Sequence, residues 1–311
     1  MTSLDPHVVV LGGGTGCPTI LEGLRRYTSK LSAVVTVMDS GGSSGRLRKE
    51  LGIPALGDLR RCLIALAGRD QNCKTLSGLM EYRFQSSGLL ADHNVGNLLL
   101  AALVEQCGDL VQAVDIIERQ LGVVGKVLPV TVENVSLCAL LDDGNVLHSE
   151  SEIDLRGASI VGIQRVYLDP VPKATPEALQ AIQEAQAVVF GPGDLYTSLL
   201  PILLVDGIPE AIRRSTARKV YVGNLTTKPG ETDHFKTSHF VTEILRYLGT
   251  DKPFDVIVAN DGRVQDEAVE VDIESCNKLA RRLVVKKVAD QNAEGLHDPD
   301  LTALAILEAM S

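Results

Sequence analysis

Five short apolar runs, each followed at once by small or polar residues, constrain the fold of this chain most strongly. Each run has four or five residues, is rich in valine, isoleucine and alanine, and lacks the strict alternation of a half-exposed strand. Such runs are typical of strands buried on both faces of a parallel sheet. They span residues 7–11, 34–38, 187–190, 219–222 and 255–259, and the polar segments after them are 12–16, 39–45, 191–194, 223–227 and 260–262.

Helical patterns lie between these runs, at residues 18–27, 57–67, 96–105, 109–120, 176–184, 195–204 and 238–248. The alternation of strand and helix predicts an α/β fold: a Rossmann-like, three-layer α/β/α, doubly wound domain with a mainly parallel sheet. Ligands of such folds bind beyond the carboxyl ends of the strands. The five polar strand ends therefore predict one shared crevice.

The middle of the chain has a different pattern. Asp142-Asp143-Gly144-Asn145 separates two extended runs, which predicts a β-hairpin, and further β-type runs follow at 159–163 and 165–168. The length of 311 residues allows one large or two ordinary domains. Because no low-complexity linker or internal repeat interrupts the sequence, we predict a single domain, 1–311, with a β-rich insertion at about 128–171.

The charge is unevenly distributed. The whole chain carries a formal net charge of −10, which argues against nucleic acids and membrane surfaces, since both are polyanions. Residues 22–69 nevertheless carry nine basic and four acidic side chains, whereas residues 251–311 carry seven basic and thirteen acidic ones. We therefore predict a small anionic, nucleotide-type ligand held in a positive crevice near the N-terminal half, and no nucleic-acid partner.

Other features of the sequence predict a cytoplasmic protein. No apolar run approaches the ~20 residues that a membrane-spanning helix needs, and no basic leader precedes the first strand. The six cysteines are scattered without a C-x-x-C motif, which fits reduced, buried thiols better than disulfides or a zinc site. No cluster among the six histidines predicts a metal site.

Two glycine-rich turns are the strongest candidates for phosphate contact. Residues 12–16 (Gly-Gly-Gly-Thr-Gly) and 191–198 each stand between a predicted strand and a helix, where bare backbone and free N–H groups suit an anion. The first turn does not match the dinucleotide fingerprint, because Cys17 or Thr19 stands where its third glycine belongs, and no P-loop lysine follows.

Further polar residues follow the other strands. Asp39 closes the second run, where Rossmann-like sites hold a ribose hydroxyl, and the glycines and serines after it allow a backbone nest for an anion. Asp58 is either a helix cap or a site carboxylate. Asn97 is a candidate helix cap, and Asn94 a candidate reader of a base or sugar. The long segment 224–232, with Lys228 and Glu231, has the length of a lid or binding loop.

The predicted ligand contacts come from all of these segments. No nucleophile with an adjacent base is recognisable among them. They are Gly12, Gly13, Gly14, Thr15, Gly16, Asp39, Gly41, Gly42, Ser43, Ser44, Arg46, Asp58, Arg61, Asn94, Asn97, Gly191, Gly193, Tyr196, Thr197 and Asn224.

Six motifs in order, at 12–16, 39–48, 57–61, 96–97, 191–201 and 229–232, resemble the bacterial gluconeogenesis factor family, relatives of 2-phospho-L-lactate transferase in the CofD-like superfamily. The resemblance covers about residues 7–262. It implies a Rossmann-like three-layer fold, a cytoplasmic protein and a UDP-sugar ligand, UDP-N-acetylglucosamine. It also implies support of cell shape and wall synthesis during growth on gluconeogenic carbon sources, a homo-oligomer such as a dimer, and cell-wall or kinase proteins as partners. No catalytic activity is established for the family.

Two departures from the family pattern affect particular parts of the site. Asp39-Ser40 stands where the family usually has two aspartates, which weakens a case for metal-assisted transfer. After residue 262 many members carry a tyrosine-containing stretch, but residues 263–277 contain no tyrosine. The phosphate end of the ligand is therefore better supported by the sequence than its sugar end.

The sequence allows three hypotheses about function, each from a different class of protein. The favoured one is a non-catalytic nucleotide-sugar sensor. The alternative is a phosphoryl-group transferase that resembles 2-phospho-L-lactate transferase, with Asp39 and Asp58 as catalytic residues and Mg²⁺ as its cofactor. The missing third glycine disfavours an NAD-dependent oxidoreductase.

Overall fold

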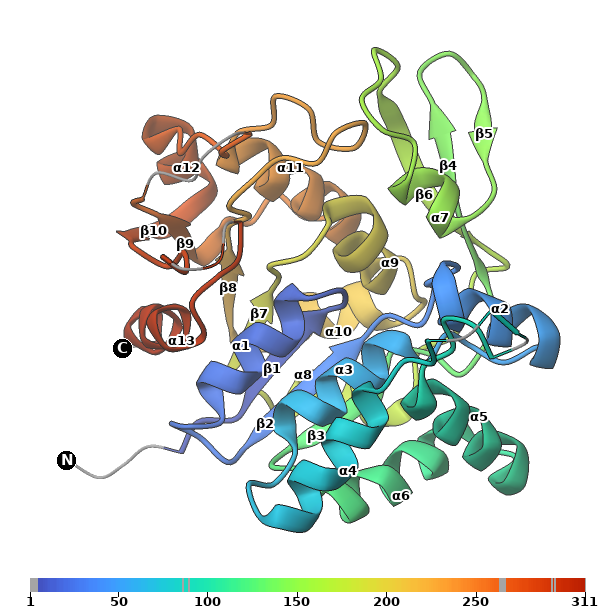
Figure 1. The fold of residues 1–311 in the computed structure, drawn as a ribbon. Coiled ribbons are helices and arrows are strands. Elements are labelled where there is room, and N and C mark those ends of the chain that lie inside the picture. The colour runs from blue at the N-terminus through green and yellow to red at the C-terminus, as the bar shows by residue number, and fades with distance from the viewer. Residues whose placement is uncertain are drawn as a thin grey trace.

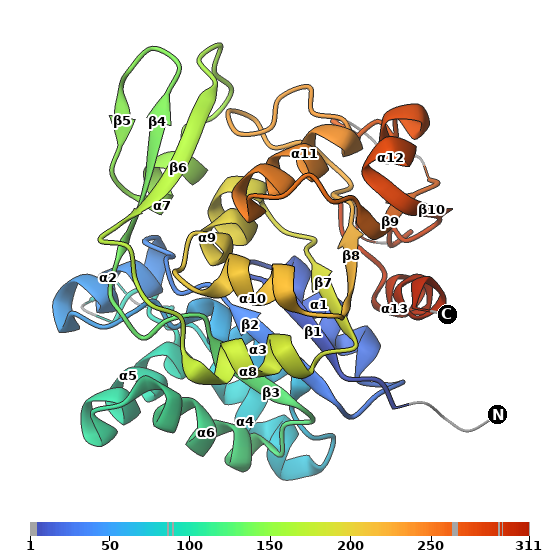
Figure 2. The ribbon, with the colours of Figure 1, turned by 180° about the vertical axis from the view of Figure 1, so that it is seen from behind.

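The computed structural model describes residues 5–85, 87–88, 90–262, 267–291, 293 and 295–310. A parallel sheet runs through the middle of the molecule, helices cover both of its faces, and a small antiparallel sheet projects from one end (Figures 1 and 2). The predicted α/β/α fold with a parallel sheet and a β-rich insertion is therefore confirmed.

The main sheet has seven strands in the order β10-β9-β8-β7-β1-β2-β3, and every neighbouring pair is parallel. From β1 the chain adds strands in one direction as far as β3, and from β7 it adds them in the other direction. This makes the β1–β7 neighbourhood the topological switch point of the sheet. The strands are β1 (Val8–Gly12), β2 (Leu31–Val35), β3 (Lys126–Pro129), β7 (Ala187–Phe190), β8 (Arg218–Val222), β9 (Phe254–Asn260) and β10 (Ala280–Lys286).

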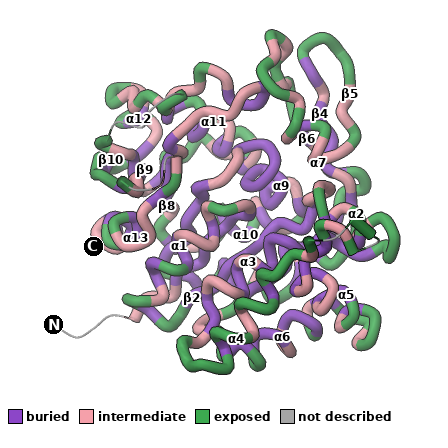
Figure 3. Tube along the Cα trace, in the orientation of Figure 1, coloured by how far each residue is buried: buried purple, intermediate pink, exposed green. Residues whose placement is uncertain are grey.

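The helices form the two outer layers. Figure 1 faces the layer that contains α1, α3 and α13, and Figure 2 faces the layer that contains α8, α10 and α11. The core between them is fully buried along β1 and β7, and Figure 3 shows buried residues in purple through the middle of the molecule. The helices are α1 (Gly16–Leu24), α2 (Gly42–Leu51), α3 (Gly57–Leu66), α4 (Gln71–Glu81), α5 (Val95–Cys107), α6 (Leu110–Leu121), α8 (Pro176–Glu184), η1 (Leu195–Leu199, a π-helix), α9 (Leu200–Leu203), α10 (Ile208–Arg214), α11 (Thr237–Leu248), α12 (Ile273–Leu279) and α13 (Pro299–Ala309).

The second strand and the segment after it differ from the prediction. The segment 31–38 is mostly apolar but contains Ser32 and Thr36, so apolarity alone did not fix which residues pair, and β2 is Leu31–Val35 instead of the predicted 34–38. The predicted glycine-serine loop is the start of helix α2. Gly45 is required inside that helix, because a Cβ on it would lie 1.9 Å from the Ser40 carbonyl oxygen.

The predicted helix 195–204 is divided into η1 and α9. Both Ser198 and Leu199 donate their backbone N–H to the Asp194 carbonyl, which widens the first turn into a π-helix. Such turns are rare and are frequent at functional sites. The sequence patterns also did not predict α4, α10, α12, α13 or β10.

The insertion forms the antiparallel sheet β5-β4-β6 with one short helix: β4 (Ser136–Leu141), β5 (Val146–Leu147), α7 (Glu150–Asp154) and β6 (Ile163–Asp169). The predicted hairpin at 142–145 is present, with Gly144 at a φ of 86°. The predicted start at 128 was too early, because β3 still belongs to the main sheet. Residues 159–162 are not a strand. The Val166 N–H donates to the Tyr247 hydroxyl over 2.7 Å, so the insertion is tied to α11.

Within the described ranges, no helix is both long and apolar enough to cross a membrane. All six cysteines are free, and all except Cys107 are buried, as the sequence predicts. The sulfur atoms of Cys17 and Cys62 lie 3.8 Å apart between α1 and α3.

Helix α1 packs closely on α13 at Gly23, which gives a test of the fold. A Cβ on Gly23 would lie 1.9 Å from the Pro299 carbonyl oxygen, so Gly23→Ala must push the helices apart. We expect it to lower the free energy of unfolding by about 1–3 kcal/mol, the usual cost of overpacking. Urea denaturation followed by circular dichroism measures this change.

The matched control is Gly78→Ala on the exposed surface of α4, where nothing lies within 4 Å of the added Cβ. We expect it to raise the stability by up to about 1 kcal/mol, because alanine favours helix more than glycine does. Equal stability of the Gly23→Ala variant and the unchanged protein would contradict the close α1–α13 contact.

Candidate functional site

The turns that follow β1 and β7 meet at the switch point with backbone close to backbone. A Cβ on Gly16 would lie 2.3 Å from the Pro192 carbonyl oxygen, and one on Gly193 would lie 3.8 Å from that of Gly13. Gly14 has a φ of 60°, in the left-handed region that favours glycine. The structure therefore brings the two predicted glycine-rich turns together, and the approach at Gly16 leaves no room for a side chain.

A cavity of about 200 Å³ opens between these turns. Thr15 and Thr19 line it from the first turn of α1, and Gly193 and Asp194 line it from the turn after β7. The first N–H groups of a helix have no intrahelical partner and carry a partial positive charge. The cavity therefore has the backbone chemistry that suits a small anion.

Asn224 stands across this cavity and fixes its wall. Its Nδ2 donates to the Gly193 carbonyl over 2.9 Å, and its Oδ1 accepts from the Tyr221 hydroxyl over 3.1 Å. The side chain that we predicted as a ligand contact thus joins the segment after β8 to the turn after β7.

Asp58 holds the first glycine-rich turn in position through a hydrogen bond to its backbone. Its side chain forms an ion pair with Arg61 and accepts a hydrogen bond from the Gly14 backbone. Burial raises the pKa of Asp58, and the neighbouring charge of Asp39 acts in the same direction. The cap interpretation is wrong, because Leu56 is the N-cap residue of α3 and Asp58 lies within the first turn.

Asp39 lies beside this support and is only half-buried. Its Oδ1 accepts from the Gly41 N–H over 2.8 Å, and its Oδ2 faces Gly57, where a Cβ would come within 3.4 Å. Since β2 ends four residues earlier, Asp39 does not close that strand directly. It nevertheless reaches the same end of the sheet as Asp58.

Four residues that we predicted as ligand contacts bind one another in a buried polar network: Ser43, Ser44, Asn94 and Asn97. Asn94 is the N-cap of α5, and its Oδ1 accepts from the Asn97 N–H over 3.1 Å, so the predicted capping role of Asn97 was wrong. The Ser43 hydroxyl accepts from the Asn94 N–H over 3.2 Å, and Asn97 Nδ2 donates to the Ser44 hydroxyl over 3.3 Å. These bonds hold the starts of α2 and α5 together, which explains why such polar side chains are buried.

The basic residues of 22–69 do not converge on the crevice as predicted. Arg46 donates to the Ala91 carbonyl over 2.6 Å, and Arg48 donates to the Met38 carbonyl over 3.1 Å, so the positive crevice of the prediction is not formed by them. The arginines bound to protein oxygens in this way are Arg25, Arg46, Arg48 and Arg60, while Arg26 and Arg61 pair with carboxylates.

Acidic side chains from the insertion reach the crevice, which the sequence did not predict. The Glu150 carboxylate accepts from the Ser40 N–H over 3.0 Å. Burial raises the pKa of Glu150 to about 7. Asp154 and Asp194 form ion pairs with Lys228 of the 224–232 segment. No local signal marks these contacts, since more than 70 residues separate Lys228 from Asp154 along the chain.

Tyr196 and Thr197 do not line the cavity between the glycine-rich turns. Tyr196 is buried and lines a second cavity of about 710 Å³, between the insertion and residues 230–235. Thr197 is also buried, and its hydroxyl has no hydrogen-bond partner in the described part of the chain. Of the predicted contacts, Thr15, Gly16, Gly193 and Asn224 line the smaller cavity and Tyr196 lines the second one, while the others line neither.

A larger cavity of about 1290 Å³ lies at the edge strand β3, between α6 and α8. Its lining includes the amino ends of β1 and β2, such as His7 and Leu31, so it is far from the switch point. Glu118 accepts from the Val127 N–H over 2.6 Å and covers part of the strand edge there. None of the predicted site residues lines it.

Comparison with known proteins gives consistent matches over most of the chain. A family model described as 2-phospho-L-lactate transferase CofD matches residues 8–291. The gluconeogenesis factor of Halalkalibacterium halodurans is 44% identical over 253 residues, 81% of this chain and 77% of that protein. The gluconeogenesis factor of Listeria monocytogenes is 41% identical over 245 residues, 78% of this chain and 74% of that protein.

A crystal structure from Bacillus halodurans, described as a member of the UPF0052 family, has the same architecture. Its TM-score to this chain is 0.90 at 38% sequence identity, covering 97% of this chain and 99% of that one. Because the match covers nearly all of both chains, the two structures share the sheet, both helical layers and the insertion.

The raised pKa of Glu150 predicts a measurable pH dependence of stability. Because the folded-state pKa of about 7 lies above the ordinary value of 4.5, the folded protein holds this proton more tightly than the unfolded chain does. The stability that it contributes is present below about pH 4.5 and is lost as the pH rises through 7. Glu150→Gln, which cannot ionise, should remove this loss.

We therefore expect Glu150→Gln to be more stable than the unchanged protein at about pH 8, by about 1–3 kcal/mol, and nearly equal to it at about pH 4. Urea denaturation at both pH values measures the difference. A stability difference that stays constant between the two pH values would show that Glu150 is not buried as described.

Proposed function

This chain belongs to the family of 2-phospho-L-lactate transferase CofD, together with the gluconeogenesis factors, and from this premise we propose that it binds a nucleotide sugar of the UDP-N-acetylglucosamine type in the cytoplasm. Its proposed role is to support cell shape and wall synthesis during growth on gluconeogenic carbon sources. The ligand and the role rest on the resemblance of the motifs described above, and the geometry at the switch point supports the diphosphate part.

The meeting of two bare glycine-rich turns at the switch point is the observation that carries this proposal. A diphosphate needs several N–H donors within reach, and side chains on Gly13, Gly14 or Gly193 would reduce the access to them. The first turn of α1 borders the 200 Å³ cavity directly. Since the arginines around it are bound to protein oxygens, backbone groups are the main donors that we assign to the phosphates.

The size of the two cavities supports a ligand longer than a phosphate. Lys228 and Asp194 line the 200 Å³ cavity, and Glu231, which pairs with Lys228, lines the 710 Å³ cavity. Ligand sites commonly occupy about 300–1,000 Å³. We propose that the diphosphate lies in the smaller cavity and that the sugar extends toward the larger one, where Tyr196 and Phe235 supply ring surfaces.

The side chains around the cavities favour binding over catalysis. His297 lines the smaller cavity, but its Nε2 contacts the Gly223 carbonyl over 3.1 Å, and burial lowers the pKa of this imidazole to about 4. It is therefore held as a neutral structural donor. Within the described ranges, no hydroxyl or thiol at the cavity stands beside a free base.

Ligand binding can be tested with Thr15→Glu. Thr15 is exposed at the start of α1, and its side chain makes no capping hydrogen bond, so the variant should fold normally. UDP-N-acetylglucosamine at about 100 times its Kd should stabilise the unchanged protein by about 2.7 kcal/mol. The added carboxylate should repel the diphosphate and remove most of the rise in Tm, as measured by differential scanning fluorimetry.

Thr75→Glu is the matched control, because Thr75 is exposed on α4 and away from both cavities. It should leave the ligand-induced shift unchanged. A Thr15→Glu variant that is stabilised by the ligand as much as the control would contradict the assignment of the phosphate site. Absence of a shift in the unchanged protein with every UDP-sugar would refute the ligand class.

The proximity of Asp39 and Asp58 favours one alternative, a phosphoryl-group transferase that resembles 2-phospho-L-lactate transferase. In this alternative Mg²⁺ neutralises charge on the transferred phosphate. Carboxylate oxygens suit Mg²⁺, but Asp58 already pairs with Arg61 and accepts from Gly14. Asp39, whose Oδ1 accepts only a local backbone hydrogen bond among the described residues, is therefore the carboxylate better placed for the metal.

The alternative predicts turnover that depends on Asp39. With Mg²⁺, a nucleotide-activated donor and a panel of hydroxyl or phosphate acceptors, Asp39→Asn should slow product formation by about 10²–10³-fold, the loss typical of removing a charge-stabilising group. Nucleotide binding by the variant should be kept. Chromatography of the products measures the rate, and absence of product from the unchanged protein across the panel would eliminate the transferase.

A further inference from the structure

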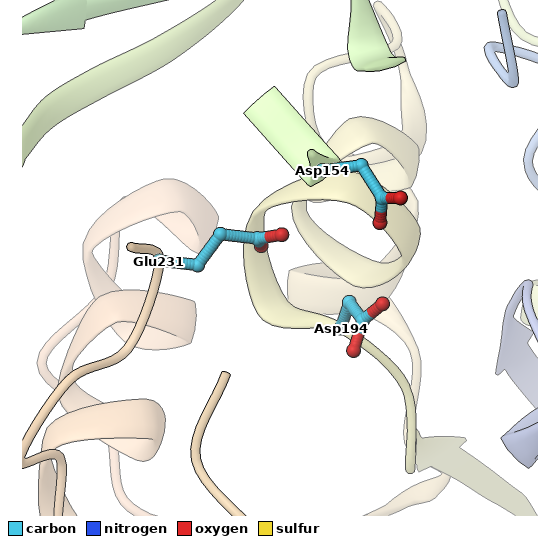
Figure 4. A group of neighbouring side chains, drawn as sticks. All are labelled: Asp154, Asp194 and Glu231. Carbon is cyan, nitrogen blue, oxygen red and sulfur yellow. The ribbon is translucent and has the colours of Figure 1, made fainter. Parts of the chain in front are cut away.

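Three carboxylates from distant parts of the chain converge beside the switch point. Asp154 ends α7 of the insertion, Asp194 precedes η1, and Glu231 lies between β8 and α11. Figure 4 shows the three side chains pointing toward a common centre, and one oxygen of each lies within 4.8 Å of the others. Like charges at this separation repel strongly where water is excluded, so the arrangement requires a cation.

Glu231 is the buried member of this carboxylate cluster. Its side chain is fully buried; among the described residues Oε1 is paired only with the Lys228 ammonium, and Oε2 has no hydrogen-bond partner. Burial raises the pKa of Glu231 to about 7. A buried carboxylate is costly without hydrogen bonds or a charge partner, so its direction toward two other carboxylates indicates a ligand for a cation.

Lys228 now supplies the positive charge. Its Nζ lies 2.7 Å from Asp194 Oδ2 and 2.9 Å from Glu231 Oε1, and it also pairs with Asp154. One ammonium cannot neutralise the Asp154 and Asp194 carboxylates together, so the cluster keeps a negative excess even when Glu231 is protonated. The Lys228 side chain is 24% exposed and borders the 200 Å³ cavity, so the ammonium has room to leave.

We propose that Asp154, Asp194 and Glu231 form a binding site for a hard divalent cation, which competes with the Lys228 ammonium for the same position. This site is separate from the Asp39–Asp58 pair and does not depend on the nucleotide-sugar proposal. Since the three ligands belong to the insertion, the turn after β7 and the loop after β8, a bound cation would fasten the insertion to the crevice.

The donor atoms define the class of cation. All three are carboxylate oxygens, which favour Mg²⁺, Mn²⁺ or Ca²⁺ over the metals that prefer nitrogen or sulfur. Bonds to Ca²⁺ of about 2.3–2.6 Å place opposite ligands up to about 5 Å apart, which matches the spread of these oxygens. Asp154 and Asp194 are partly exposed, so water can complete the coordination.

The test is a titration with Mn²⁺ alone, followed by the electron paramagnetic resonance signal of free Mn²⁺, with Ca²⁺ measured by calorimetry. Lys228→Met removes the competing ammonium and keeps an apolar stem. It should bind about one equivalent of Mn²⁺ at least about tenfold more tightly than the unchanged protein, because a positive charge has left the site. Adding Glu231→Gln to this variant should weaken binding at least about tenfold.

Glu210→Gln is the matched control, since Glu210 is an exposed carboxylate on α10 that pairs only with Arg214 in the described structure. It should not change Mn²⁺ binding. If Lys228→Met binds Mn²⁺ no more tightly than the unchanged protein, or keeps its affinity when Glu231→Gln is added, the cation site is refuted and Lys228 is the permanent partner of the three carboxylates.

Removing Lys228 leaves three carboxylates close together, so circular dichroism must report whether the variant folds. Folding of Lys228→Met only with Ca²⁺ or Mn²⁺ present would support the site. If it stays unfolded in both, Mn²⁺ binding by the unchanged protein decides: loss of that binding in Glu231→Gln supports the proposal, and its absence or its persistence in the variant overturns it. No nucleotide is present, so this outcome is independent of the proposed function.

Discussion

The close approach of two backbone turns at the β1–β7 switch point is the constraint on which the rest of the site depends. Gly16 lies so near the Pro192 carbonyl that any side chain there would force the turns apart. Because these turns start α1 and η1, their contact sets where both helices begin and how wide the cavity between them is. Asp58 and Asn224 then hold the two turns in place from opposite sides.

Electrostatics in the crevice follows from this backbone arrangement more than from the charged side chains. Arg46 and Arg48 of the N-terminal half donate hydrogen bonds to backbone carbonyl groups. The Glu150 carboxylate of the insertion instead lies near the strand ends, where it accepts from the Ser40 N–H. An anion at this place depends on oriented N–H groups, which add positive potential without a net charge. Such groups would let a protein with a net charge of −10 hold the proposed small anion without a net positive charge at the site.

Strands buried on both faces could be predicted well from the sequence. A glycine directly after an apolar run marks the residue at which the strand ends. The run 187–190 coincides with β7, and β8 and β9 differ from their runs by one residue at their ends. The second strand was predicted three residues too late, because the mostly apolar segment 31–38 is longer than the five residues that pair. The sequence did not predict helix α2, because its first turn consists of glycine and serine, and both residues favour loops.

The candidate site could be predicted only in part, for a different reason. The glycine-rich turns carry their own local signal, since close approach requires glycine. Ser43, Asn94 and Asn97 have the same polar character as ligand contacts, but tertiary packing uses them to join two helix starts. The meeting of Asp154 with Lys228 joins two segments whose proximity no local pattern encodes. Residues 263–266, in the divergent stretch without tyrosine, lie outside the described residues.

The wide separation of the two turns along the chain has a consequence for synthesis. Gly16 emerges from the ribosome long before Pro192, and β3, the insertion and α8 must form between them. Contacts between such distant residues form late. Closing the long loop between them costs chain entropy before the new contacts can stabilise the structure. The first glycine-rich turn of the nascent chain therefore stays uncovered until β7 has been added to the sheet, and the proposed ligand site is complete only after that step.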